Sequence, residues 1–241
     1  MRRTPDITLP GLDPIPVLYE DRAVLVIDKP AGWLVVPPTW QRTGRNLLAA
    51  LLSSMGAGDH WARSRGLKFL RFVHRLDAET TGVLLFVKSP GAIGPYSALF
   101  ESRRVEKTYL AVVSPAPGRA SWTCRLPLSP EPGRPGRVRV DTRHGKPAET
   151  RFRRLQTQHG RSLLEVRPQT GRTHQIRVHL AASGCPVLGD SLYGPQPHPQ
   201  GLALRAIRLA YLDPFTHRPV EIRAPADAFC QRYGFDVPSL E

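Results

Sequence analysis

The sequence predicts an α+β fold with a mixed, mainly antiparallel central sheet and flanking helices. Short apolar segments typical of strands outnumber helical segments, and the two kinds do not alternate regularly as they would in a doubly wound parallel sheet. The chain has 241 residues and is 41% hydrophobic, which suffices for a sizeable core. Neither a linker nor an internal repeat interrupts it. We therefore expect one domain over residues 17–241, preceded by an irregular segment, 1–16.

The first half of the chain contains three strand-like stretches, each short, apolar and bounded by turn residues. They are 23–36, which a Pro-Gly turn divides into two strands, 69–73 and 83–88. Asn46 is a good helix N-cap and predicts a short helix that ends at Gly56. The following stretch, 56–68, is basic, contains glycine and is expected to be a loop.

In the second half, Pro95 is expected to begin a helix. Residues 114–145 are rich in proline, glycine and arginine and predict a loop with short strands. Thr173 is expected to cap a helix that stops at Gly184. The remaining strand predictions are 108–113, a hairpin over 149–168 that turns at His159-Gly160, and 202–212.

The charge of the chain indicates a polyanionic partner. Its 34 basic residues, against 20 acidic ones, give a net charge of +14. Only five of the basic residues are lysines, which leaves 29 arginines. The planar guanidinium matches phosphate and stacks on bases, so the composition favours nucleic acid. A GC-rich genome would explain the ratio of arginine to lysine but not the net charge.

Other features of the sequence limit the class of protein. No apolar run is long enough for a membrane span, and no apolar stretch follows Arg2 and Arg3 as in a signal peptide. We therefore expect a cytoplasmic protein. The three cysteines lie far apart and are expected to be reduced. No set of residues has the spacing of a zinc site, so no metal is expected.

A polar segment at residues 74–82 stands between two apolar strands. A carboxylate at Asp77, flanked by Arg75 and backed by apolar walls, would be shielded from water and held charged by an ion pair. The alternative is an ordinary turn aspartate. The residues alone leave both interpretations open.

A second polar segment runs from Gln169 to His179. Gly171 precedes the expected cap Thr173, so a turn would lead into a helix N-terminus, which favours anions, and Arg172 adds a phosphate-binding fork. Arg177 lies among apolar neighbours. It either is partly buried and requires a carboxylate partner, or extends to solvent.

The segment HRLDAETTGVLLFVK resembles the signature of the RluA family of pseudouridine synthases, and four further motifs resemble that family in the same order. These are VIDKPAGWLVV, VEKTYLAVV, GRTHQIRVHLAASGCPVLGDSLYG and LALRAIRLAYLDPFTHRPV. Together they extend over nearly the whole chain. The resemblance implies the pseudouridine synthase fold.

The resemblance also assigns roles by motif position. It implies that Asp77 is the catalytic carboxylate, that Tyr109 stacks on the target base, and that Arg177 pairs with Asp77. Arg75 is expected to contact RNA and to help hold the target nucleotide out of its helix. The full set of implied substrate-binding residues is His74, Arg75, Leu76, Lys107, Arg172, His174 and Gln175.

Three positions depart from the family pattern. Thr81 stands where serine is usual, Arg205 where histidine is common, and Pro37-Pro38 where His-Pro is common. None is among the implied catalytic residues. With the first motif near residue 17, no S4-type RNA-binding domain is expected to precede it, so the catalytic domain would bind RNA by itself.

The implied activity is the isomerisation of specific uridines in ribosomal RNA, transfer RNA or both. The reaction involves no redox change and is expected to need neither cofactor nor metal. We expect RNA as the partner and a monomer without an obligatory protein partner. The alternatives are a catalytically silent RNA-binding or RNA-folding module on the same scaffold, the sister family whose motif reads G-R-L-D, and a nuclease. A nuclease would require a cluster of metal-binding acids that the sequence does not show.

Overall fold

The structure, a computed structural model, describes residues 6–35 and 45–239. The chain divides into two units, which are treated separately: unit 1, residues 1–105 and 209–224, and unit 2, residues 106–208 and 225–241. Strand β11 (Leu204–Leu212) contributes residues to both. The single domain over 17–241 stays a prediction. Pro37-Pro38 and the last residue of the predicted 23–36 strand pair lie outside the described residues.

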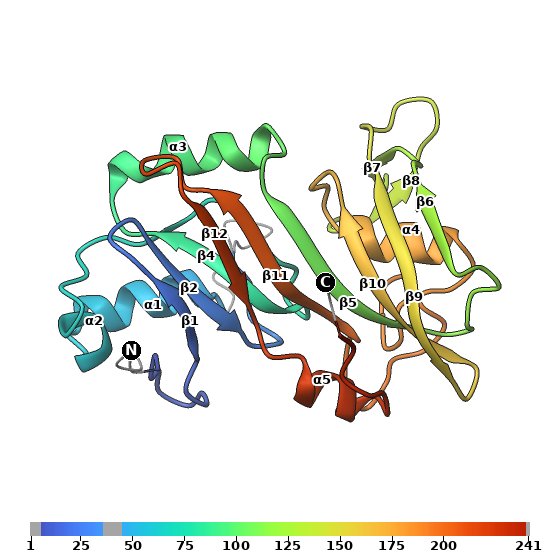
Figure 1. Ribbon diagram of the computed structural model, residues 1–241, viewed down its shortest axis with the longest axis horizontal. Coiled ribbons are helices and arrows are strands. Elements are labelled where there is room, and N and C mark those ends of the chain that lie inside the picture. The colour runs from blue at the N-terminus through green and yellow to red at the C-terminus, as the bar shows by residue number, and fades with distance from the viewer. Residues whose placement is uncertain (1–5, 36–44, 240–241) are drawn as a thin grey trace. The chain divides into compact units, whose positions relative to one another are not determined.

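Unit 1 contains a sheet whose strands follow the order β1-β2-β4-β11, with β3 paired to β4 and β12 to β11 (Figure 1). Its own strands are β1 (Val17–Glu20), β2 (Val24–Lys29), β3 (Arg71–Phe72), β4 (Thr81–Val87) and β12 (Pro219–Arg223). Its helices are α1 (Leu47–Gly56), α2 (His60–Arg63) and α3 (Pro90–Glu101). Before β1, buried Ile7 and Ile15 form an antiparallel bridge.

Unit 2 continues from β11 in the order β11-β5-β10-β9-β6, and a separate hairpin pairs β7 with β8. Its strands are β5 (Glu106–Val113), β6 (Ser121–Cys124), β7 (Leu128–Pro130), β8 (Val138–Val140), β9 (Thr150–Gln158) and β10 (Arg161–Pro168). Its helices are α4 (Gln175–Ala182) and α5 (Asp227–Arg232). Helix α4 packs against β8, β9 and β10.

The α+β class and the mainly antiparallel sheet are confirmed, because the strand pairs β1–β2, β2–β4, β3–β4, β5–β10, β6–β9, β7–β8 and β9–β10 are all antiparallel. Asn46 caps α1 by accepting a hydrogen bond from the Ala49 N–H at 3.1 Å, as predicted. The hairpin of β9 and β10 turns at His159-Gly160, both with positive φ, also as predicted.

Several predicted boundaries were wrong. Helix α3 begins at Pro90, in the N1 position after Ser89, so Pro95 lies inside the helix. The 56–68 loop contains α2, and the strand expected over 69–73 is only two residues long. A second strand was predicted after the Pro-Gly turn. The described residues there form only a single parallel bridge, between Leu34 and Asn46.

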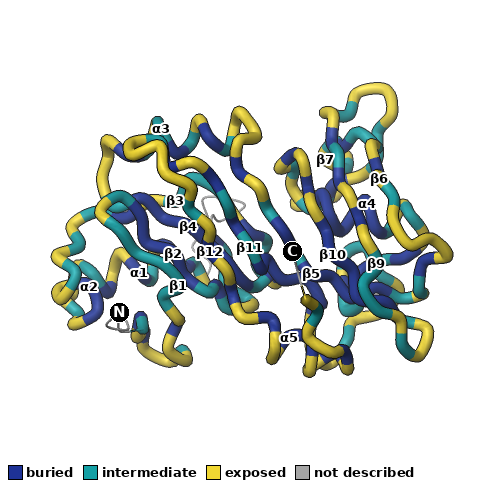
Figure 2. Tube along the Cα trace, in the orientation of Figure 1, coloured by how far each residue is buried: buried dark blue, intermediate teal, exposed yellow. Residues whose placement is uncertain are grey.

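The inner strands of each unit are buried along most of their length (Figure 2). In unit 1, alternate residues of β2 and β4 pack with α3 in one apolar cluster. In unit 2, residues of β5 and β10 pack with α4, with α5 and with the residues after α5 in another apolar cluster. All three cysteines, Cys124, Cys185 and Cys230, are buried and form no disulfide with one another.

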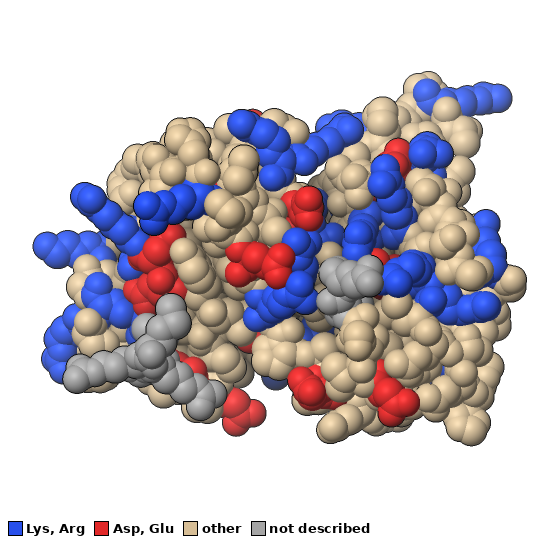
Figure 3. Space-filling view, viewed as in Figure 1, with Lys and Arg blue, Asp and Glu red and all other residues tan. Residues whose placement is uncertain are grey.

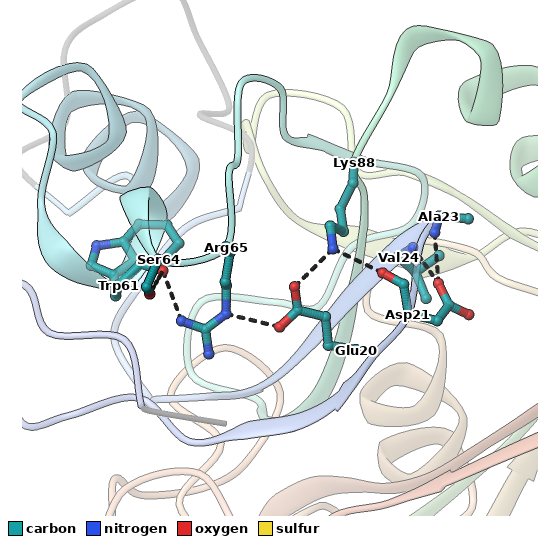
Figure 4. A network of polar contacts seen from close by, with 8 residues as sticks. All are labelled: Glu20, Asp21, Ala23, Val24, Trp61, Ser64, Arg65 and Lys88. Atoms are coloured by element: carbon teal, nitrogen blue, oxygen red, sulfur yellow. Dashed lines mark hydrogen bonds and ion pairs between the residues drawn. The ribbon is translucent and has the colours of Figure 1, made fainter. Parts of the chain in front are cut away.

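An ion-pair network links β1, β4 and the end of α2 in unit 1 (Figure 4). The Glu20 carboxylate accepts from Arg65 Nε at 2.8 Å and from Lys88 Nζ at 2.7 Å. Lys88 also donates to the Asp21 carbonyl oxygen. The carboxylate of Asp21 closes the turn by accepting from the N–H groups of Ala23 and Val24. The network therefore fixes the turn between β1 and β2 and the residue that follows β4.

Candidate functional site

The loop between β3 and β4 in unit 1 carries the predicted catalytic aspartate. Asp77 is half-buried, its neighbour Leu76 is buried, and Arg75 is exposed. The Thr80 N–H donates to the Asp77 carbonyl oxygen at 3.2 Å and closes a turn. Leu76 thus anchors the loop in the core, while its two neighbours keep contact with the surface.

A buried lysine is hydrogen-bonded to the backbone of this loop. Lys29, the last residue of β2, is fully buried, and its Nζ donates to the carbonyl oxygens of Pro30, Ala78 and Thr80 at 2.9, 2.7 and 3.0 Å. Gly32 adds a backbone hydrogen bond to the Ala78 oxygen at 2.9 Å. An ammonium group has three N–H donors, and all three are used.

The charge state of Lys29 follows from its surroundings. Burial lowers its pKa to about 8, although the carboxylates of Glu79 and Asp77 act in the opposite direction. The amine is therefore mainly protonated at neutral pH and places a positive charge beneath the Asp77 loop. Our prediction of site residues did not include Lys29. The signal was the lysine that ends an apolar strand in the K-P-x-G motif.

His74 attaches the start of the same loop to β4 and α3. Its Nε2 accepts from the Leu85 N–H at 3.0 Å, so this nitrogen carries no proton. The ring stacks on Phe100 with centroids 4.5 Å apart and planes 12° apart. These contacts give His74 a role in shaping the loop, and its direct contact with RNA stays a prediction.

In unit 2, β5 carries Lys107 and Tyr109, which lie two residues apart and therefore on the same face of the sheet. Tyr109 is half-buried and packs against the core. The Lys107 Nζ donates to the Thr170 carbonyl oxygen at 3.4 Å, and burial lowers its pKa to about 8. A Cβ on Gly171 would lie 3.7 Å from this nitrogen, an ordinary contact distance, so the turn at Gly171 passes beside Lys107.

Gln175 shapes the turn that leads into α4. Its Oε1 accepts from the Thr170 hydroxyl at 2.6 Å and from the Arg172 N–H at 3.0 Å. Its Nε2 donates to the Glu149 carbonyl oxygen and to the Thr150 hydroxyl, both at 2.9 Å. These bonds satisfy both sides of a buried amide within the protein. A direct contact between Gln175 and RNA stays a prediction.

The prediction that Thr173 caps α4 was wrong. His174 precedes the helix in a left-handed conformation, with φ of 52°, and makes no side-chain cap. Its Nδ1 lies 2.8 Å from the Tyr193 hydroxyl, a partner 19 residues further along the chain that holds this conformation. Arg172 is half-buried, and its Nε donates to the Pro147 carbonyl oxygen at 3.2 Å. Gly184 ends the helix with positive φ, as predicted.

Arg177 is buried, as one of the two interpretations of the sequence required. Its Nε and Nη2 donate to Asp190 Oδ2 and Oδ1 at 2.8 and 2.6 Å. Asp190 is fully buried, and we did not single it out from the sequence, although it stands in the G-D-x-x-Y-G part of the motif GRTHQIRVHLAASGCPVLGDSLYG. The pairing of Arg177 with Asp77 stays a prediction.

The predicted site residues thus form two groups. His74, Arg75, Leu76 and Asp77 lie together in unit 1 with Lys29. In unit 2, the segment from Thr170 to Arg177 and the neighbouring β5 bring together the other six, namely Lys107, Tyr109, Arg172, His174, Gln175 and Arg177.

Exposed arginines mark the surface of β9 and β10. Figure 3 shows lysine and arginine side chains gathered over these strands. Arg151, Arg153 and Arg167 are exposed, and the last two pair with the buried Glu165. In the register, Arg151 lies directly opposite Arg167. After pairing with carboxylates, these arginines still give the strands a positive surface, which suits a polyanion.

The described parts of the chain contain neither a candidate metal site nor a candidate membrane-spanning helix. No group of three His, Cys, Asp or Glu side chains there could hold a metal ion. None of the helices within 6–35 and 45–239 is both long and apolar enough to cross a membrane.

Comparisons with known proteins agree with these motifs. A family model described as RNA pseudouridylate synthase matches residues 23–182. The chain is 34% identical to ribosomal large subunit pseudouridine synthase C of Vibrio vulnificus over 87% of its own length and 65% of that protein. It is 38% identical to an uncharacterized RNA pseudouridine synthase of Zymomonas mobilis, over 74% and 78% of the two chains. It thus spans about two thirds of the Vibrio protein.

Solved structures show the same fold. Human RNA pseudouridylate synthase domain containing 1 superposes with a TM-score of 0.72 at 27% identity, over 91% of this chain and 87% of that one. Human RNA pseudouridylate synthase domain containing 4 superposes with a TM-score of 0.71 at 24% identity, over 92% of this chain and 94% of that one. This second likeness supports the fold alone. The chain belongs to the RNA pseudouridylate synthase family.

Proposed function

We propose that the chain isomerises specific uridines in RNA to pseudouridine, with Asp77 as its essential carboxylate. The observation that carries the proposal is the family match over residues 23–182, which runs from β2 to α4. That range contains Asp77, Tyr109 and Arg177, together with Lys29, whose ammonium group holds the Asp77 loop.

The reaction breaks the N-glycosidic bond of uridine, rotates the detached uracil and rejoins it to the sugar through carbon. Atoms and electrons balance without a co-reactant. A carboxylate must either attack the sugar or remove a proton from it, and Asp77 serves in both routes. Extruding the base from RNA costs a few kcal/mol. Stacking on the face of Tyr109 would recover about 1–3 kcal/mol of this.

We propose ribosomal RNA as the first substrate to test and transfer RNA as the second. The Vibrio relative, and one from Salmonella typhimurium that is 34% identical over 90% of this chain, are named as synthases of the large ribosomal subunit. Mapping pseudouridine in total RNA from cells with and without the gene identifies the position. A site that disappears only from transfer RNA would contradict the ribosomal assignment.

The chain is further proposed to act in the cytoplasm as a monomer that binds RNA without an obligatory protein partner. The exposed arginines of β9 and β10 support direct binding of RNA. Light scattering coupled to gel filtration should give a mass near 26.8 kDa. A mass of twice that value would contradict the proposed monomer.

The decisive test is Asp77→Asn. Asparagine is nearly isosteric and keeps the loop, but it can neither attack the sugar nor take its proton. Pseudouridine formation should fall to background, while the dissociation constant for RNA changes by less than about tenfold, or 1.4 kcal/mol. The matched control is Glu79→Gln, which neutralises an exposed carboxylate in the same loop and should keep the activity. Wild-type rates in Asp77→Asn would disprove the assignment.

The same measurements separate this proposal from a catalytically silent RNA-binding module. Such a module would bind RNA with the same salt dependence, but its wild-type form would produce no pseudouridine. The presence of Asp77, Tyr109 and Arg177 at their motif positions argues against it, because a binding module has no need of this combination.

A further inference from the structure

The guanidinium of Arg177 is held by buried neighbours, and these neighbours extend the proposed function. Arg177 is 4% exposed, and two of its N–H groups form parallel hydrogen bonds with the carboxylate of Asp190. A bidentate pair of this kind fixes both the position and the plane of the guanidinium, which a single hydrogen bond would not do. The side chain of Asp190 is fully buried, so solvent does not compete for it.

Asp190 is itself held in place by backbone groups. Its Oδ1 accepts from the N–H groups of Leu192 and Tyr193 at 2.9 and 3.0 Å. The Gly194 N–H donates to the Asp190 carbonyl oxygen at 2.9 Å. A Cβ at Gly194 would lie 2.7 Å from that oxygen, so the turn closes only over a glycine. The turn therefore presents the carboxylate to Arg177 in one orientation.

The ring of Tyr193 packs against the guanidinium of Arg177. The Cζ of Arg177 lies 5.3 Å from the centroid of its ring, and the Cζ of Arg137 lies 5.2 Å from it. The Tyr193 hydroxyl accepts from the Val138 N–H at 2.9 Å and is hydrogen-bonded to His174 Nδ1. The ring is thus fixed by the β7–β8 hairpin and by the residue that precedes α4.

We propose that Asp190 and Tyr193 are positioning residues, which orient the guanidinium of Arg177 for the isomerisation. The inference rests on the proposed function. A guanidinium has five N–H groups, and Asp190 engages two of them, so it determines where the other three point. A displacement of about 1 Å in a catalytic group can lower a rate by about 100-fold. The residues therefore act through Arg177.

The test compares Asp190→Asn with wild type. An amide keeps one acceptor but turns an NH2 group toward the guanidinium, which breaks the bidentate pair. The single-turnover rate of pseudouridine formation should fall by about 10–100-fold, because the guanidinium would no longer be held in one position. The dissociation constant for RNA should change by less than about threefold, because Asp190 is buried. This separates a defect in chemistry from one in binding.

The matched control is Asp141→Asn. Asp141 also lies in a turn of unit 2, where its carboxylate accepts from two backbone N–H groups, but its side-chain partners are Ser129, Arg139 and His144. Its substitution disturbs a comparable turn and should keep the rate within about threefold of wild type. Tyr193→Phe keeps the ring face and should exceed Tyr193→Leu in rate by roughly 3–30-fold.

A spectroscopic measurement reports on orientation without relying on activity. The Nε–H of an arginine held by a carboxylate exchanges slowly with water and gives a distinct NMR signal, identified here by its loss in Arg177→Lys. The signal should persist in wild type and Asp141→Asn and should broaden or vanish in Asp190→Asn. If it persists unchanged in Asp190→Asn, Asp190 does not position Arg177.

The outcomes distinguish the inference from the proposed function. An active wild type together with an equally active Asp190→Asn overturns the positioning role and leaves the proposed function intact. A wild type that forms no pseudouridine overturns both. An equal loss of rate in Asp141→Asn and Asp190→Asn would show a general effect of destabilised turns and would also overturn the inference.

Discussion

Lys29 is a charged side chain that the protein buries completely, at the end of its second strand. Taking an ammonium out of water is costly unless its donors are satisfied, and here three carbonyl oxygens satisfy them. Two of these oxygens, those of Ala78 and Thr80, flank the turn that follows Asp77. The hydrogen bonds that satisfy the buried ammonium of Lys29 therefore also fix the geometry of the Asp77 loop.

Replacing Lys29 with methionine should affect both stability and activity. The variant leaves buried carbonyl oxygens without a donor, and each such group costs about 1–3 kcal/mol. Urea unfolding should show a loss of at least about 2 kcal/mol, and single-turnover rates should fall. The control is Lys88→Met, which removes a lysine of unit 1 that pairs with Glu20 and directly follows β4, at the opposite end of that strand from the Asp77 loop. Equal activity in the two variants would refute the role of Lys29.

Tyr109 offers a test of base stacking. Tyr109→Phe keeps the ring face, so RNA modification should continue at a rate near that of wild type. Tyr109→Ala loses a stacking contribution of about 1–3 kcal/mol and should be correspondingly slower in single turnover. If the alanine variant matches the phenylalanine variant, Tyr109 is an ordinary strand residue.

The sequence located the catalytic candidates but not their supports. Asp77 and Arg177 stand in motifs that can be recognised in the sequence, and burial of Arg177 was one of the two interpretations that its apolar neighbours allowed. Its carboxylate Asp190 lies 13 residues further along, and the link from Tyr193 to His174 spans 19. Local patterns do not specify contacts at such separations, because the turn geometry that creates them depends on tertiary packing.

Helix α4 is fastened to β9 by a buried histidine. The Nδ1 of His179 lies 2.9 Å from the Thr150 hydroxyl, and its Nε2 lies 2.9 Å from the Leu126 carbonyl oxygen. Burial lowers the pKa of His179, although the bond to Leu126 acts in the opposite direction. The helix that carries Arg177 therefore depends on a neutral imidazole.

Acid should weaken this attachment. The folded pKa is below the ordinary value of 6.5, so the unfolded chain binds more protons as the pH falls through that value. The contribution of His179 to stability is complete above pH 6.5 and declines below it. Between about pH 7.5 and about pH 5, wild type should lose more unfolding free energy than His179→Gln does. His144→Gln, at an exposed position, is the control. Parallel pH curves for wild type and His179→Gln would contradict the prediction.

Elements defined by local chemistry were predicted well. The Asn46 cap of α1 and the His159-Gly160 turn between β9 and β10 depend on neighbouring residues alone. The start of α3 was missed because Pro90 and Pro95 both suit a first turn, and only the structure shows that the earlier one begins the helix. The cap of α4 was missed because a distant tyrosine holds His174 in its left-handed conformation.

The net charge of +14 predicts how the protein binds RNA. Each phosphate neutralised by arginine or lysine releases counterions, so log affinity should fall with log salt by about 0.7–0.9 per phosphate. Filter binding over a range of salt concentrations measures this slope. Asp77→Asn should give the same slope, because it changes the chemistry and not the phosphate contacts. A slope near zero would show that the basic surface does not bind RNA.

The α+β class could be predicted because strand and helix patterns are set by hydrophobic periodicity. The division into two units could not, since β11 reads as one continuous apolar strand while its residues contribute to both. The pairing of β1 and β12 could not be predicted either, because these strands of unit 1 are short and their sequences give little sign of their partners. Pairing across long separations is decided by the packed sheet.

The burial of all three cysteines has a practical consequence for reactivity. Burial raises the pKa of the Cys185 and Cys230 thiols, that of Cys230 to about 11, which suppresses the nucleophilic thiolate. The folded protein should accordingly resist alkylating reagents and disulfide crosslinking. A single cysteine introduced at the exposed position Arg151 would then be the dominant reactive thiol, and a fluorophore or crosslinker attached there would report on RNA contact without removal of the native cysteines.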